Sequence, residues 1–420
     1  MEIKNVNGMK KERAVLAGLS AASMDERERS TEESMAELAA LVETAGGEAV
    51  AWVLQNRQAP EPRSFLGEGK VRELQELIAS HGCDLAVFDN ELSPSQMRVL
   101  SEELGVKVLD RSGLILDIFA QRARTREGQL QVELAQYQYL LPRLIGMWKH
   151  LERQEGAIGT RGPGETQLES DRRHIGRKIA KLKEELAAVR KVRGTQRRKR
   201  EKNAVSVAAL VGYTNAGKST LLNRLTGAEI PANDRLFDTL DTTTRRLMLE
   251  PGREILLSDT VGFIRKLPHH LVEAFKATLE ELAYADVLLH VIDLSNPEWE
   301  AQAEVVDDLI RQLGAEKTPC LRVYNKCDAY LGLLPRDRES VCISARTGEG
   351  ADRLLERLRE ILDRQGRRAA LLLPYDRGAL LDALRREGAV LSVDYRDEGI
   401  RAEVFLSEAL WPRFREFVRE

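Results

Sequence analysis

The chain has 420 residues, which is too long for one ordinary hydrophobic core and predicts two to four domains. Its 43% hydrophobic and 31% charged residues are typical of a soluble globular protein, and a net charge of −3 excludes a surface that is basic throughout. The four cysteines lack the paired spacing of a zinc site or a disulfide framework, and no apolar run reaches membrane-spanning length. We therefore expect a cytoplasmic protein without a membrane span.

Residues 1–126 alternate short apolar runs with helical patterns, which predicts a small α/β domain with parallel strands. The runs "RAVLAGLS" and "EAVAWVLQ" are typical of strands. The segment between them opens with a helix-capping pattern at Thr31 and closes on Gly46 and Gly47. This domain could hold a catalytic site of its own. Because its sequence shows no nucleophile with a matching base, we favour a binding or docking role.

Residues 127–202 change to long helical patterns. The first pattern contains Pro142, where a bend is possible, and in the second pattern apolar residues recur at alternating spacings of four and three. These residues are Ile175, Ile179, Leu182, Leu186 and Val189. Between the two patterns lies a glycine-rich segment, residues 156–166. The sequence therefore predicts an antiparallel helical hairpin with an exposed loop.

The end of the second helix carries a run of basic residues with a single acid. The run comprises Arg190, Lys191, Arg193, Arg197, Arg198, Lys199, Arg200 and Lys202. In a chain that is acidic overall, this segregation favours contact with phosphates. The alternative is a solvated surface helix without a partner.

Residues 203–365 open with "VSVAALVGYTNAGKSTLLNRLTG", which has the strand, loop and helix of a phosphate-binding loop. Gly212 and Gly217 let backbone N–H groups face the phosphates, Lys218 reaches the β and γ oxygens, and Ser219 is a candidate Mg²⁺ ligand. The pattern predicts a nucleotide-binding domain with a doubly wound sheet.

The motif "NKCD" predicts which base is bound. Asn325 and Lys326 would brace the loop, and the carboxylate of Asp328 can accept hydrogen bonds from the N1–H and 2-amino groups of guanine. The segment that begins at Ser344 fits the loop that covers the guanine carbonyl. Guanine rather than adenine is the expected base, because adenine offers neither donor.

Two further segments stand at the positions along the chain where contacts to a γ-phosphate are expected. A threonine of "FDTLDTTTRR" should bind Mg²⁺, with Thr239, Thr242, Thr243 and Thr244 as candidates. In "DTVG", Asp259 would hold Mg²⁺ through water, and Gly262 would donate its N–H to the γ-phosphate. Phe263 follows where Ras-like GTPases keep the glutamine that orients water, and a phenyl ring cannot do this.

Residues 366–420 predict a small α+β domain, and we see no chemistry in it. The whole chain is thus expected to be a multidomain α/β protein: parallel α/β domain, helical hairpin, P-loop domain and small α+β domain. The predicted nucleotide-binding residues are Gly212, Tyr213, Thr214, Asn215, Ala216, Gly217, Lys218, Ser219, Thr220, Phe237, Asp238, Thr239, Leu240, Asp241, Asp259, Thr260, Val261, Gly262, Asn325, Lys326, Asp328, Ser344, Ala345 and Arg346.

Along nearly its whole length the chain resembles the HflX family of translation-associated GTPases. The motifs that carry the resemblance are "LGEGKVRELQEL", "GTRGPGETQLE", "GYTNAGKST", "FDTLDTTTRR", "DTVGFIRKLPHHLVEAF" and "NKCD". The resemblance implies binding to the large ribosomal subunit and its RNA, a hairpin loop that reaches toward the peptidyl-transferase region, and rescue of stalled ribosomes by subunit splitting. It also implies that Thr239 is the Mg²⁺ ligand. One departure is Thr242, where the family usually has proline.

We interpret the chain as a monomeric GTPase that hydrolyses GTP slowly until the ribosome assists. Lys218, Gly262 and Thr239 are its expected catalytic residues; Ser219, Thr239 and, through water, Asp259 are its expected metal site. By resemblance, Asn215 could also hold K⁺ against the phosphates. Two alternatives stay open: an RNA-binding GTPase of ribosome assembly or RNA modification, and a nucleotide-sensing adaptor for a protein partner.

Overall fold

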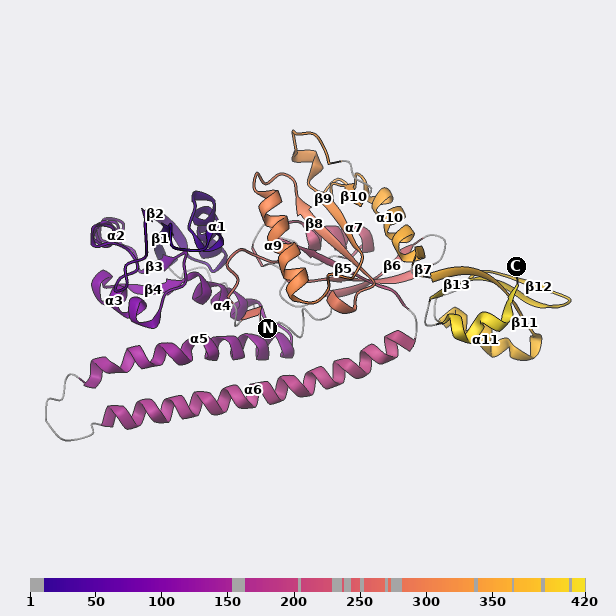
Figure 1. Ribbon diagram of the computed structural model, residues 1–420, viewed down its shortest axis with the longest axis horizontal. Coiled ribbons are helices and arrows are strands. Elements are labelled where there is room, and N and C mark those ends of the chain that lie inside the picture. The colour runs from indigo at the N-terminus through magenta and orange to yellow at the C-terminus, as the bar shows by residue number, and fades with distance from the viewer. Residues whose placement is uncertain are drawn as a thin grey trace, which may run out of the picture. The chain divides into compact units, whose positions relative to one another are not determined.

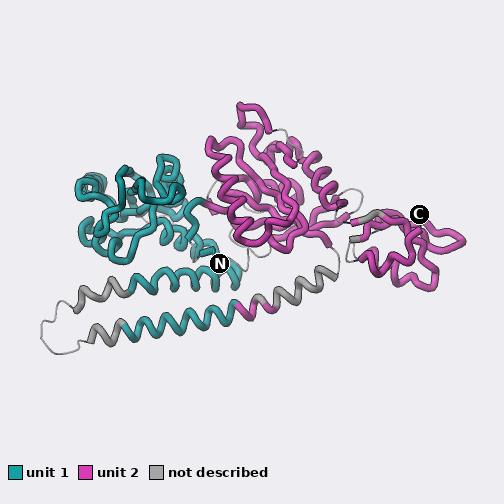
Figure 2. Tube along the Cα trace, in the orientation of Figure 1, with its two compact units in different colours: residues 1–186, 265–275 teal, residues 187–264, 276–420 magenta. Residues whose placement is uncertain are grey.

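The computed structural model describes residues 11–152, 163–202, 205–228, 236–237, 243–249, 253–268, 271–272, 282–335, 339–364, 366–386, 390–407 and 410–419. The chain divides into two units (Figure 2). Unit 1 comprises Met1–Leu186 and Arg265–Phe275, and unit 2 comprises Ala187–Ile264 and Lys276–Glu420. Within the described residues, no helix is long and apolar enough to cross a membrane.

Unit 1 contains a four-stranded parallel sheet with the strand order β2-β1-β3-β4 (Figure 1). The central strand β1 is buried over most of its length, as expected for a parallel sheet that helices cover. The strands are β1 (Arg13–Ala21), β2 (Glu48–Arg57), β3 (Leu85–Phe88) and β4 (Lys107–Asp110). The helices are α1 (Glu32–Thr44), α2 (Glu68–His81), α3 (Pro94–Leu104) and α4 (Arg111–Arg122). The predicted parallel α/β fold is confirmed.

Local sequence explains where two of these helices begin. Thr31 precedes α1, and its hydroxyl accepts a hydrogen bond from the backbone N–H of Ser34 in a complete capping box. Ser93 caps α3 in the same way through Gln96. The caps satisfy backbone donors that have no partner within the helix, so the helix starts are encoded by a few adjacent residues.

Two long helices follow, α5 (Arg126–Glu152) and α6 (Pro163–Lys202). They run antiparallel, because Arg126 contacts Glu185 at 2.8 Å and the Lys178 ammonium contacts the Tyr137 hydroxyl at 2.6 Å (Figure 1). Helix α5 continues through Pro142. Of the predicted loop, residues 156–162 lie outside the described residues, and residues 163–166 instead form the first turn of α6. For the basic run, the structure gives the helical backbone.

Unit 2 contains a six-stranded sheet with the order β10-β9-β8-β5-β7-β6, parallel except for β6. The strands are β5 (Val207–Gly212), β6 (Thr243–Leu249), β7 (Arg253–Asp259), β8 (Val287–Asp293), β9 (Cys320–Asn325) and β10 (Ser340–Cys342). Its helices are α7 (Lys218–Thr226), α9 (Trp299–Gln312) and α10 (Ala351–Arg364). Helices α7 and α10 share one apolar cluster with the sheet, and Figure 1 shows α9 on the other face. The adjacent carboxyl ends of β5, β7, β8 and β9 place the predicted motifs together.

The C-terminal part of unit 2 is a small antiparallel sheet with helices. Its elements are β11 (Gly366–Leu373), α11 (Gly378–Arg386), β12 (Val390–Arg396), β13 (Gly399–Ser407), α12 (Trp411–Phe414) and β14 (Val418–Arg419), in the strand order β12-β13-β11-β14. The α+β class is as expected, but the final helix is one turn long. The chain then extends and pairs with β11, with Arg419 opposite Ala370.

Candidate nucleotide site

The phosphate-binding loop joins β5 to α7, and two of its glycines are required by close contacts. A Cβ at Gly212 would overlap the carbonyl oxygen of Val291. Gly217 has φ +91°, and a Cβ there would overlap the side-chain nitrogen of Asn325. The second glycine of the motif therefore makes room for the asparagine of "NKCD", which is more than a hundred residues away in sequence.

Lys218 lies within this loop with its side chain buried. Its ammonium donates to the carbonyl oxygens of Gly212 at 3.0 Å and Tyr213 at 2.8 Å. Burial lowers the pKa of Lys218 to about 8, and the nearby carboxylate of Asp259 offsets part of that effect. The Lys218 ammonium is thus hydrogen-bonded to carbonyl groups of the phosphate-binding loop itself. Oxygens of a bound phosphate would compete with these carbonyls for its N–H groups.

A pair of oxygen ligands lies beside the lysine. The Ser219 hydroxyl donates to a carboxylate oxygen of Asp259 at 2.7 Å, and the Asp259 side chain is fully buried at the end of β7. Hydroxyl and carboxylate oxygens are what Mg²⁺ prefers, so these residues fit the ion. Among the described residues, no group of three or more His, Cys, Asp or Glu could form a separate metal site.

The "DTVG" turn is hydrogen-bonded to the phosphate-binding loop. The N–H of Phe263 donates to Gly212 at 3.1 Å, and the N–H of Thr214 donates to the carbonyl of Phe263 at 2.7 Å. The Phe263 ring is 1% exposed, so it packs in the core and leaves the orientation of water to other groups. At Gly262, a Cβ would lie 2.8 Å from the Cα of Thr214 and 3.2 Å from the Lys218 ammonium nitrogen.

One residue of the threonine-rich switch segment also contacts this loop. Phe237 is 1% exposed, and its N–H donates to the Thr214 hydroxyl at 2.8 Å. Its φ of +55° is uncommon for a residue with a side chain. Of the other predicted switch residues, Asp238, Thr239, Leu240, Asp241 and Thr242 lie outside the described residues, whereas Thr243 and Thr244 begin β6.

Asn325 connects three segments of the site. Its side chain is buried; it donates to the carbonyl of Ala216 at 2.8 Å and accepts from the N–H of Ala345 at 2.9 Å. The side-chain amide of Asn325 therefore joins "NKCD" to the phosphate-binding loop and to the loop after β10. Replacing that amide would leave a buried N–H and a buried carbonyl without their partner.

The remaining base-recognition residues are held by charge. The Lys326 ammonium contacts Asp293 at 2.7 Å. Arg346 contacts Asp328 at 2.5 Å, and a hydrogen bond from Ser344, followed by the charge of Arg346, lowers the pKa of Asp328. The Asp328 carboxylate is therefore ionised at neutral pH and can accept hydrogen bonds from donors on a base.

The structure adds two residues that sequence reasoning missed. Asp293 ends the apolar strand β8, just as Asp259 ends β7, and this position could have marked it. Arg224 on α7 donates to the carbonyls of Ala345 and Arg346 and so supports the base loop. No local pattern distinguishes Arg224 from other helical arginines.

Most predicted residues meet at the carboxyl ends of the strands, although not all of them face a ligand. The Thr260 hydroxyl donates to the carbonyl of Leu210 at 2.6 Å, which gives it a role in joining β7 to β5. Tyr213 is 4% exposed. The Ala216 carbonyl accepts from Asn325, which helps to fix the conformation of the loop.

Three family models match the chain in succession. They are described as GTP-binding GTPase N-terminal (residues 32–120), GTP-binding GTPase Middle Region (residues 122–200) and 50S ribosome-binding GTPase (residues 207–326). Together they span most of the first domain, the hairpin and most of the P-loop domain.

The chain is also similar to curated proteins along its length. A GTPase HflX of Caldanaerobacter subterraneus is 46% identical over 97% of this chain and 94% of the relative. The GTPase HflX of Escherichia coli is 47% identical over 83% of each chain. Among solved structures, a GTP-binding protein from Sulfolobus solfataricus in complex with GDP matches with a TM-score of 0.45 and 25% identity, covering 83% of this chain and 98% of the other.

Proposed function

Because this chain belongs to the HflX family of GTPases, we propose that it is a guanine-nucleotide switch that binds the large ribosomal subunit and splits or rescues stalled ribosomes. Binding and hydrolysis of GTP are the activities of that family. We further propose that the protein is a monomer and acts in the cytoplasm.

The observation that carries the proposal is the helical hairpin. Helices α5 and α6 are 27 and 40 residues long, and the glycine-rich segment connects them. Helix α6 ends in the basic run, whose charges suit RNA phosphates. The model that matches residues 207–326 is described as a 50S ribosome-binding GTPase, which supports the large subunit as the partner.

We assign the phosphate chemistry to residues at the ends of β5 and β7. Lys218 would bind the β- and γ-phosphates, and Gly262 would donate its N–H to the γ-phosphate. Ser219 and Thr239 would hold Mg²⁺ directly and Asp259 through water. When bound, this ion neutralises charge on the phosphate oxygens. Asp328 would select guanine.

The buried Phe263 raises the question of what orients the attacking water. Unassisted GTPases of this class turn over at about 10⁻⁴ to 10⁻³ s⁻¹, and outside help can add a factor of ~10³–10⁵. We propose that the ribosome supplies this help by ordering the switch segment. A potassium ion near Asn215 is the second candidate, and turnover with and without large subunits, in potassium and in sodium, separates the two.

Ribosome action is tested by co-sedimentation and light scattering with purified subunits in GTP or GDP. Replacing residues 159–164 by a short neutral turn should abolish splitting and keep nucleotide binding. Replacing Arg197, Arg198, Lys199 and Arg200 by glutamine should weaken association and flatten its salt dependence. If both variants split ribosomes normally, the hairpin is only structural. Binding to free RNA without subunit binding would favour the RNA-binding alternative.

A further inference from the structure

The segment that follows the "DTVG" turn belongs to a different unit from the turn itself. Ile264 is the last residue of its stretch in unit 2, and Arg265–Phe275 group with unit 1 (Figure 2). The backbone therefore passes from one unit to the other after Ile264, one residue beyond Phe263, which is hydrogen-bonded to the phosphate-binding loop. This position makes the contacts of the segment relevant to nucleotide binding.

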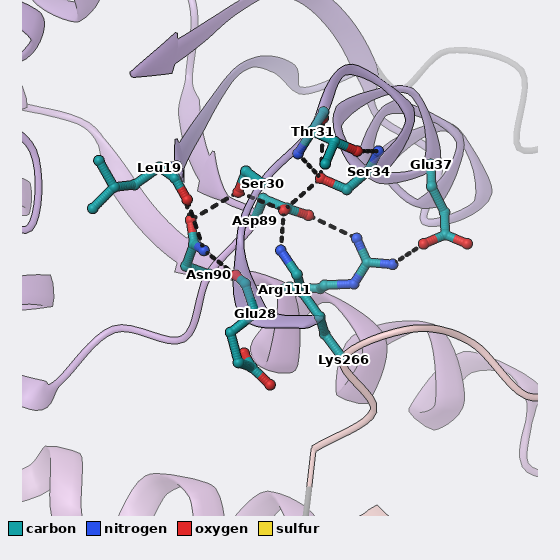
Figure 3. Close-up of polar contacts among 10 residues, drawn as sticks. All are labelled: Leu19, Glu28, Ser30, Thr31, Ser34, Glu37, Asp89, Asn90, Arg111 and Lys266. Atoms are coloured by element: carbon teal, nitrogen blue, oxygen red, sulfur yellow. Dashed lines mark hydrogen bonds and ion pairs between the residues drawn. The ribbon is translucent and has the colours of Figure 1, made fainter. Parts of the chain in front are cut away.

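The segment is attached to unit 1 through a buried ion pair. The Lys266 ammonium contacts a carboxylate oxygen of Asp89 at 2.5 Å (Figure 3). The Lys266 side chain is 6% exposed and the Asp89 side chain 0%. Asp89 follows β3, so the lysine reaches the carboxyl end of the parallel sheet, where α/β domains commonly bind ligands.

Asp89 is surrounded by donors that fix its orientation. It accepts from Arg111 at 2.7 Å, from the Ser30 hydroxyl at 2.7 Å and from the Ser34 hydroxyl at 2.9 Å (Figure 3). Glu37 contacts the same Arg111 guanidinium from the other side. Arg111, Ser30 and Ser34 all belong to the first domain, so the site for the ammonium is built without the incoming segment.

The electrostatics show that Lys266 is part of this charge balance. Burial alone would raise the pKa of Asp89, but the charges of Arg111 and Lys266 outweigh it and lower the pKa. Burial lowers the pKa of Lys266, and Asp89 opposes that effect. Removing one partner from a buried pair leaves the other charge poorly compensated, so undocking Lys266 is unfavourable.

The backbone at Lys266 has an unusual conformation. Its φ is +54°, a left-handed value that a residue with a side chain rarely adopts. Such a conformation persists only when the surrounding contacts compensate for it, and the buried ion pair with Asp89 is a contact of this kind.

Between the two attachment points there are only Ile264 and Arg265. Phe263 is bonded to Gly212 and Thr214 at one end, and Lys266 is bonded to Asp89 at the other. Three residue steps span at most about 11 Å when extended, so the connection has little slack. A shift of Gly262 or Phe263 toward a γ-phosphate is therefore transmitted along this short connection to Lys266.

We propose that Lys266 is a positioning residue whose ion pair with Asp89 holds the "DTVG" turn against the phosphate-binding loop and so opposes binding of GTP more than binding of GDP. This inference rests on the proposed role of Gly262 at the γ-phosphate. It gives the first domain a function: Asp89 is the receptor for the segment that follows the turn. GDP, which lacks the γ-phosphate, leaves the attachment in place.

The test is the variant K266M in the full-length chain. We expect its affinity for a non-hydrolysable GTP analogue to rise about fivefold or more, the lower end of typical coupling between sites, while its GDP affinity stays within about twofold of wild type. D89N should shift the same ratio, and the double variant should add nothing further. K266R, which keeps a positive charge, should restore much of the wild-type ratio.

The matched control is E37Q, which alters the Arg111 cluster without touching Lys266 and should leave the ratio unchanged. Hydrogen exchange gives a second readout, since the N–H groups of Leu271 and Val272 bond to Pro268 and should exchange faster in K266M. An unchanged ratio, or equal loss of both nucleotides, would overturn the proposal. Absence of guanine-nucleotide binding in the wild-type protein would instead refute the proposed function.

Discussion

At the candidate guanine end of the site, Asn325 joins Ala216 and Ala345 through two hydrogen bonds, whereas at the phosphate end Lys218 and Phe263 bond to the loop that should receive the phosphates. The first set of contacts can stay when a base arrives. At the phosphate end, the Lys218 ammonium donates two of its three N–H groups to the carbonyls of Gly212 and Tyr213, so contact with both the β- and γ-phosphates requires exchange of at least one of these bonds. Base recognition is thus prepared in advance, and phosphate recognition requires rearrangement.

This difference has a physical cause. A base is identified by fixed donors and acceptors, so a rigid site loses least entropy and rejects the wrong base best. A switch must instead have two arrangements of similar free energy, which a site with competing internal hydrogen bonds provides. Variants at the guanine end should therefore affect all guanine nucleotides equally, and variants at the phosphate end should separate GTP from GDP.

The largest effect is expected for Asp328→Asn. The amide cannot accept hydrogen bonds from both the N1–H and 2-amino groups, and each bond to the carboxylate contributes about 1.5–3 kcal/mol. Affinity for GDP and GTP should fall together, by roughly 100-fold or more. Xanthine nucleotides should bind better than to wild type, since an amide can donate to the 2-oxo group. Competition binding with GDP, GTP and the corresponding xanthine di- and triphosphates measures both effects. Unchanged GTP affinity would refute the assignment of the base.

A smaller effect that separates the nucleotides is expected for Gly262→Ala. The added Cβ would lie 2.8 Å from the Cα of Thr214, so the turn must move away from the loop. The Gly262 N–H would then be misplaced for the γ-phosphate, and single-turnover hydrolysis should fall at least about tenfold. GDP affinity should remain within about threefold of wild type.

Gly69→Ala is a suitable control for this variant, because a Cβ there has open space around it. Gly69 lies in α2 of the first domain, far from the phosphate-binding loop in sequence. It should leave hydrolysis unchanged. Equal loss of GDP and GTP binding in Gly262→Ala would mean that this turn, like the guanine end, is a fixed part of the site.

The same contrast explains how much the sequence could predict. The elements of the first domain were predictable from periodicity and caps such as Thr31 and Ser93, because those signals lie within a few residues. The phosphate-binding loop was predictable because its glycines and lysine stand at fixed spacing. That Gly217 makes room for Asn325 was not, since only the fold brings them together.

Contacts between distant segments account for the rest. Lys266 and Asp89 are separated by 177 positions, and neither stands in a pattern that pairs them. The two-residue strand β14 pairs with β11, so it depends on a contact that no local pattern specifies. The switch threonine Thr239 lies outside the described residues and stays a prediction. Contacts between distant segments, and not local sequence preferences, therefore determine the Lys266–Asp89 pair and strand β14.

The smallest expected effect is a pH dependence that belongs to the phosphate end alone. Burial lowers the pKa of Lys218 to about 8, so in the free protein this side chain loses its proton as the pH rises through that value. Bound phosphates favour the charged ammonium and raise the pKa again. Binding above pH 8 therefore requires uptake of a proton, whereas below pH 8 the lysine is already charged.

From pH 7 to pH 9, GDP affinity should consequently fall by up to about tenfold, with most of the loss above pH 8. GMP is the control, because its single phosphate does not extend to the β position that Lys218 is expected to contact, while its guanine ionises in the same way as that of GDP. Competition binding at several pH values measures both ligands. If the affinities for GDP and GMP fall in parallel with pH, the titrating group lies at the guanine end of the site. In that case the phosphates do not release Lys218 from the carbonyls of Gly212 and Tyr213.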